Sequence, residues 1–242
     1  MKTIISIIIL MMLQSCTENK IISIVDPKVL AIPIKENHEK LIDLKDQNII
    51  AFGSSPEIPN NTDYTKLRAT VYEKLIEAQK ALPQNLKFRI YEGYRSLQLQ
   101  EQLFDNRYQE LKNKYPSWNK EKVFTETVVL VSPVTNFDGS KNIPAHSTGG
   151  AFDIYLINEK GEVLDMGIET KDWAKDTDGS VSQTDSKKIS KQAQQYRSIM
   201  SEVLTKVGFV NYPTEYWHWS YGDRYWAYNK KEPFALYGSV ND

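Results

Sequence analysis

The chain of 242 residues has few cysteines and histidines and no excess of charge of either sign. Its single cysteine, Cys16, excludes an internal disulfide. There are 30 Lys and Arg residues and 31 Asp and Glu residues, which give a net charge of −1. Nucleic-acid binding usually requires a basic patch, so this balance gives no electrostatic reason to expect a nucleic-acid partner. The apolar run at residues 4–13 is short for a membrane span.

The amino terminus has the pattern of an export signal. Lys2 precedes the apolar run, and about ten apolar residues suit the core of a signal peptide. The run ends in Leu-Gln-Ser-Cys at residues 13–16, which resembles a bacterial lipobox. We therefore predict a signal peptide over residues 1–15, a lipidated Cys16, and a location in the cell envelope on the periplasmic side or outer cell surface. The alternative, an uncleaved signal anchor, also places the domain outside the cytoplasmic membrane.

The rest of the chain is predicted to form one domain. Residues 16–40, with Pro27 and Pro33, are predicted to be a tether, and residues 41–242 the folded domain. Helical and strand-like apolar patterns are mixed without regular alternation. Helices are predicted at 65–82, 97–115, 120–131 and 191–207, and strands at 48–53, 86–91, 150–157, 162–166, 209–212 and 217–221. The polar segment 170–188 is too long for a mere connection, which favours a lid or pocket wall. We predict an α+β fold with a small antiparallel sheet flanked by helices.

Two short stretches carry residues suited to one catalytic zinc site. His146 and Asp153 lie in the first stretch, and Glu215 and His218 lie in the second. A catalytic zinc takes three protein ligands and leaves a fourth position open, and a hydrolase also needs a carboxylate that is not a ligand. A spacing of seven would point His146 and Asp153 to opposite faces of one strand, but the glycines at 149–150 can break that strand. Each motif alone is weak, and an ordinary polar histidine is the alternative.

Arg95 is a further candidate, at the end of the strand predicted at 86–91. It follows Gly93, which permits unusual backbone angles. A guanidinium at this position could stabilise the oxyanion that forms when water attacks a carbonyl. The alternative is an ion pair with a surface acid, and the spacing alone does not place Arg95 beside the zinc site.

A family resemblance connects these residues. The segments that carry it are Glu-Gly-Tyr-Arg at 92–95, His-Ser-Thr-Gly-Gly-Ala-Phe-Asp at 146–153, Leu-Asp-Met-Gly at 164–167, Gly-Phe-Val-Asn-Tyr-Pro at 208–213, and the run from Glu215 to Tyr228. In this order they closely resemble the D-alanyl-D-alanine dipeptidases of the VanX type, in the wider group of zinc D,D-carboxypeptidases. The resemblance covers about residues 41–228.

The resemblance implies an enzyme with one zinc ion per chain. By resemblance, His146, Asp153 and His218 are the zinc ligands, Glu215 is the general base and acid, and Arg95 steadies the tetrahedral intermediate. The implied reaction is hydrolysis of the dipeptide D-Ala-D-Ala to D-alanine in cell-wall peptide metabolism. The expected partners are a small D-amino-acid dipeptide or wall peptide, with no nucleic acid, and a membrane only through the lipid anchor.

Two departures from the family pattern mean that the sequence does not decide between a dipeptide and a longer peptide as the substrate. Pro144 stands where these enzymes carry a Ser that holds the substrate's amino end, and Pro offers neither a hydroxyl nor an N–H. Asp46 stands where a Tyr is expected, and it could meet a substrate ammonium. One alternative is a zinc D,D- or L,D-carboxypeptidase that trims peptidoglycan stem peptides. Another is a non-catalytic zinc-binding module for wall peptides, which would need neither Glu215 nor Arg95.

Overall fold

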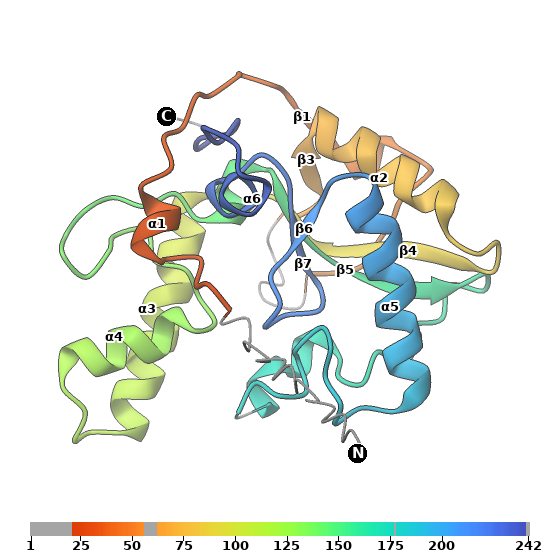
Figure 1. The fold of residues 1–242 in the computed structure, drawn as a ribbon. Helices are drawn as coiled ribbons and strands as arrows, with labels where there is room; N and C mark the ends of the chain where they lie inside the picture. Colours follow the sequence, from red (N-terminus) through yellow and green to blue (C-terminus); the bar gives the residue numbers. More distant parts are fainter. Residues whose placement is uncertain (1–20, 56–61, 177, 241–242) are drawn as a thin grey trace, which may run out of the picture.

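The computed structural model describes residues 21–55, 62–176 and 178–240, and a five-stranded sheet lies at its centre (Figure 1). Its strands follow the order β2 (Ala51–Phe52), β4 (Leu86–Glu92), β5 (Ala151–Asn158), β7 (His218–Ser220) and β6 (Val210–Asn211). The predicted α+β class is confirmed. The sheet is mixed, however, because β2 pairs with β4 in parallel while the other three pairings are antiparallel. A crossover through further elements separates β2 from β4, as a parallel pairing requires.

Two helices cover one face of this sheet. Helix α2 (Ala69–Ala81) and helix α5 (Lys191–Lys206) lie side by side there (Figure 1). Alternate residues of a strand point to opposite faces. The residues that β4 and β5 direct into this core include Leu86, Phe88, Ile90, Phe152, Ile154 and Leu156. The residues between them therefore face the other side of the sheet, where the polar site is built.

The remaining helices and turns complete the domain. Helices α3 (Leu97–Lys114) and α4 (Lys120–Val128) form a helical hairpin, and α6 (Arg224–Lys230) follows β7. Short 3-10 turns are present at η1 (Leu44–Asp46), η2 (Ala145–Thr148) and η3 (Thr170–Lys175). None of the helices among the described residues is long and apolar enough to cross a membrane.

Two sequence predictions for these elements were wrong in detail. The helix predicted from residue 65 begins at Ala69, because β3 (Lys66–Arg68) pairs with β1 (Leu41–Asp43) in a separate two-stranded sheet. The return strand predicted at 162–166 makes only an isolated bridge between Ile157 and Val163.

Residues 21–40, here called the N-terminal segment, belong to the predicted tether but pack against the domain. They include the short helix α1 (Pro27–Leu30), whose first turn is capped by Asp26, and Val29 is fully buried. Val29 packs with Tyr212 and Tyr225 in an apolar cluster. This segment is therefore part of the folded surface. Cys16, the predicted lipidation site, lies outside the described residues.

Candidate active site

Strand register brings two of the predicted ligands together. Asp153 on β5 is the direct partner of His218 on β7. Side chains directly opposite on antiparallel strands point to the same face and have neighbouring Cβ atoms. His218 Nδ1 accordingly lies 3.0 Å from Asp153 Oδ1. Glu215 belongs to the turn before β7 and His218 is the first residue of that strand, as the sequence pattern favoured.

The third predicted ligand, His146, comes from the 3-10 turn η2. Its Nε2 lies 3.2 Å from His218 Nδ1 and 3.4 Å from Asp153 Oδ2. Gly149 ends the turn at φ +70°, a left-handed angle that favours glycine, and a Cβ on it would lie 2.6 Å from Leu41 Cδ2, so that side chain would have to move. The glycine pair thus breaks the strand between His146 and Asp153, and the two side chains converge.

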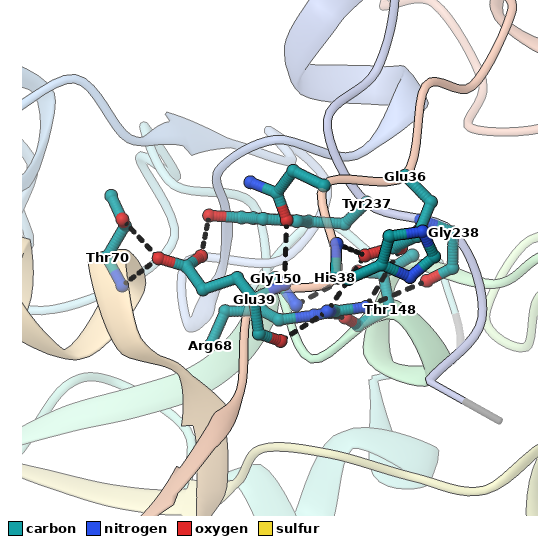
Figure 2. A network of polar contacts seen from close by, with 10 residues as sticks. Glu36, His38, Glu39, Arg68, Thr70, Thr148, Gly150, Tyr237 and Gly238 are labelled. Carbon is teal, nitrogen blue, oxygen red and sulfur yellow. Dashed lines mark hydrogen bonds and ion pairs between the residues drawn. The ribbon is translucent and has the colours of Figure 1, made fainter.

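Glu36 of the N-terminal segment and Arg68 anchor η2 through a chain of polar contacts (Figure 2). Arg68 Nε donates to Thr148 O at 2.8 Å, and the Arg68 backbone N–H donates to Gly149 O at 2.9 Å. Both carboxylate oxygens of Glu36 accept from the Arg68 guanidinium at 3.0 Å. Arg68 is only 3% exposed. A buried, paired arginine therefore fixes the turn that carries His146.

These three side chains have the chemistry of a zinc site. Their ligand atoms all lie within 4.8 Å of one another, and all three residues are buried. Two imidazoles and one carboxylate are a normal donor set for zinc. His146 Nδ1 lies 2.8 Å from the carbonyl oxygen of Gly93, and such a bond orients a ligating histidine and leaves Nε2 for the metal. No other His, Cys, Asp or Glu trio gathers this closely in the described parts of the chain.

The pKa shifts of Asp153 and His146 suit metal binding, whereas the raised pKa of His218 means that a metal must displace its proton. Burial alone would raise the pKa of the Asp153 carboxyl, but the neighbouring imidazoles of His146 and His218 hold that pKa well below its ordinary value. Burial lowers the pKa of His146. Burial would lower the pKa of His218 as well, but its hydrogen bond to Asp153 and the carboxylate charge raise it. An ionised carboxylate and neutral imidazoles are the states in which these groups bind a metal.

The three side chains line a cavity of about 360 Å³, to which Glu215 and Arg95 also contribute. The structure thus brings all five predicted site residues to one place. The turn that carries Glu215 is fixed by its backbone. The Glu215 N–H donates to Tyr212 O at 2.9 Å, and Asn211 Nδ2 donates to Glu215 O at 3.1 Å. Glu215 therefore enters the cavity from a rigid turn, three residues before His218.

Arg95 is held by two residues that the sequence analysis did not identify as part of the site. Its Nη1 donates to Gln100 Oε1 at 2.9 Å, and Gln100 in turn donates to Ser132 O at 2.7 Å. Its Nε lies 3.5 Å from Glu92 Oε1. The Arg95 backbone N–H also donates to His146 O at 3.2 Å. The guanidinium is therefore fixed beside the turn that carries His146.

The cavity walls come from distant parts of the chain. Trp173, from the segment predicted as a lid or pocket wall, lines the cavity, and Pro144 and Ile24 do so as well. Asp46 is exposed in η1 and is not among the cavity residues, so the suggested contact with a substrate ammonium has no structural support. No sequence pattern pointed to Ile24 or Gln100, because their positions depend on tertiary packing.

Comparison with known proteins identifies relatives. The family model of peptidase M15, described as D-Ala-D-Ala dipeptidase, matches residues 64–235. A protein of Synechocystis sp. named D-alanyl-D-alanine dipeptidase is 26% identical, covering 87% of this chain and 96% of the relative. The solved structure of VanYB in complex with D-Alanine-D-Alanine has a TM-score of 0.44 at 14% identity, covering 84% of this chain and 93% of that chain. The LdcB LD-carboxypeptidase has a TM-score of 0.38 at 15% identity, covering 84% and 82%.

Proposed function

The chain belongs to the peptidase M15 family of D-Ala-D-Ala dipeptidases, and we propose that it hydrolyses the free dipeptide D-Ala-D-Ala to two molecules of D-alanine. One observation carries the proposal. The His146, Asp153 and His218 ligand atoms lie within 4.8 Å of one another in a cavity that Glu215 and Arg95 also line. A site that only held a structural zinc would need neither of the last two residues.

Each residue of the site has a separate role in the proposed reaction. A zinc ion bound by His146, Asp153 and His218 would polarise the scissile carbonyl and make a water molecule acidic. Glu215 accepts the proton of the attacking water and passes it to the leaving amine. Arg95 donates hydrogen bonds to the oxygen on which negative charge develops.

Supporting residues keep Arg95 in place for that role. Glu92 and Gln100 bind the guanidinium from two sides, so it is already oriented before substrate arrives. Such preorganised donors lower the barrier because they need no reorientation during the reaction.

A second candidate is a D,D- or L,D-carboxypeptidase that trims stem peptides. Pro144 favours it, since this cavity residue offers neither a hydroxyl nor an N–H to a substrate amino group. The deciding experiment measures D-alanine release by the zinc-loaded protein from free D-Ala-D-Ala and from N-acetyl-D-Ala-D-Ala. The dipeptidase predicts a strong preference for the free dipeptide. A preference for the capped peptide would support the D,D-carboxypeptidase instead of the dipeptidase.

We also propose that the protein acts in the cell envelope, anchored by a lipid on Cys16. The apolar run and the lipobox-like sequence before Cys16 support this. Ile24 is eight positions after Cys16, and an extended chain spans at most about 3.5 Å per residue, so the anchor would hold Ile24 within roughly 28 Å of the membrane. Metabolic labelling with palmitate tests this: the label should enter the wild type and be absent from Cys16→Ala.

A further inference from the structure

We propose that the N-terminal segment forms the wall that limits the length of the substrate, with Ile24 as the specificity-determining residue. This inference deepens the proposed peptidase function and rests on it. Ile24 lines the same cavity as His146, Asp153 and His218, although it lies more than a hundred residues before them in the sequence.

Local hydrogen bonds give this part of the segment a defined shape. The Asp26 backbone N–H donates to Ser23 O at 3.0 Å and closes a turn around Ile24. The Asp26 carboxylate then accepts from Lys28 N at 2.9 Å and caps α1. Ile24 is thus presented by a turn and a capped helix rather than by a free end.

Apolar packing ties the turn to the catalytic side of the cavity. Ile22 and Ile24 pack against the cluster of Val29, Tyr212 and Tyr225. Tyr212 is buried and also lines the cavity, and its ring centroid lies 6.2 Å from that of His218. Its backbone carbonyl accepts the hydrogen bond of the Glu215 N–H. Ile24 therefore packs on Tyr212, the residue whose backbone carbonyl holds the turn that carries Glu215.

An isoleucine at this position disfavours a longer peptide for two reasons. Its branched side chain occupies space that an extended chain would need. It also offers no hydrogen-bond partner to the additional amide, and a buried amide without a partner is unfavourable. A free dipeptide that fits within the cavity meets neither penalty.

The test compares Ile24→Ala with Ile22→Ala in the full chain purified in detergent. Ile22 is a matched control because it packs on the same cluster and does not line the cavity. The measured quantity is kcat/KM for free D-Ala-D-Ala, for N-acetyl-D-Ala-D-Ala and for tri-D-alanine. Ile24→Ala should raise the rate on at least one longer substrate, relative to the dipeptide, by about tenfold or more. Ile22→Ala should keep the wild-type preference.

A second variant covers the case in which Ile24→Ala is unstable in a thermal melt. Ile24→Trp adds volume to the wall and should raise KM for the free dipeptide with little change in kcat. An unchanged preference in Ile24→Ala, an equal change in Ile22→Ala, or an unchanged KM in Ile24→Trp would overturn the inference. Wild-type protein that hydrolyses none of the three substrates would instead contradict the proposed function.

Discussion

The floor of the cavity and its walls are built in different ways. The floor residues His146, Asp153 and His218 stand on an anchored turn and two paired strands, where backbone hydrogen bonds fix their places. The walls include Ile24 and Trp173, which come from segments outside the sheet and pack against two different apolar clusters. The difference teaches that the chemistry rests on residues of the sheet and its anchored turn, whereas selectivity rests on wall side chains, Ile24 and Trp173, that are not among the metal ligands.

Loss of a floor ligand gives the largest expected effect. His218→Ala removes a buried imidazole from the ligand trio, so the protein should lose both its zinc and all measurable activity. Elemental analysis and D-alanine release on the same sample measure this. His38→Ala is the matched control, because His38 is exposed and lies outside the trio. If His218→Ala kept its full zinc content and activity, His218 would not be a required ligand, and the functional difference between floor and walls would not hold.

Glu215→Gln should separate metal binding from proton transfer. The amide keeps the shape of the side chain but cannot accept the proton, so kcat should fall by about 10²- to 10⁴-fold while zinc content stays at the wild-type level. Glu110→Gln serves as the control, since Glu110 also lines the cavity but is largely exposed and paired with Arg107. If Glu215→Gln retained activity, Glu215 would be an ordinary carboxylate of the cavity and not the general base.

Arg95→Ala should have a somewhat smaller effect. Loss of an oxyanion donor lowers kcat by about 10²- to 10³-fold. Arg107→Ala, at another cationic residue of the cavity, should leave kcat near the wild-type value. Steady-state kinetics on the dipeptide distinguish the two. Equal losses in both variants would mean that positive charge in the cavity, rather than the position of Arg95, supports the reaction.

Trp173→Ala should have the smallest effect and should alter binding alone. Removal of this wall side chain is expected to raise KM by about tenfold, equivalent to roughly 1.4 kcal/mol of binding free energy, with zinc and kcat unchanged. Trp118→Ala, at a tryptophan stacked on Tyr115 outside the cavity, is the control. A large fall in kcat for Trp173→Ala would show that the wall takes part in the chemistry.

The same contrast explains what could be predicted from the sequence. The floor residues sit in short local motifs, and the glycine at 149 marked the break that lets His146 meet Asp153. The α+β class also followed from local patterns. The parallel pairing of β2 with β4 could not be predicted, because the sequence of a two-residue strand does not indicate which strand it pairs with.

The walls could not be predicted for a related reason. Gln100, in the first turn of α3, lies only five residues after Arg95, but no spacing rule joins the two side chains. Residues 16–40 contain prolines and have no clear period, so they were predicted to be a tether. Yet Val29 and Ile24 in this stretch pack on Tyr212, and Glu36 pairs with buried Arg68. Contacts of this kind depend on the folded partner surface, which the local sequence does not contain.

The most direct test of the catalytic floor is D-alanine release from free D-Ala-D-Ala by metal-free protein titrated with zinc. One site built from His146, Asp153 and His218 predicts that activity rises in proportion to zinc and saturates at one zinc ion per chain. Activity that is independent of zinc, or no D-alanine at full zinc occupancy, would contradict the account.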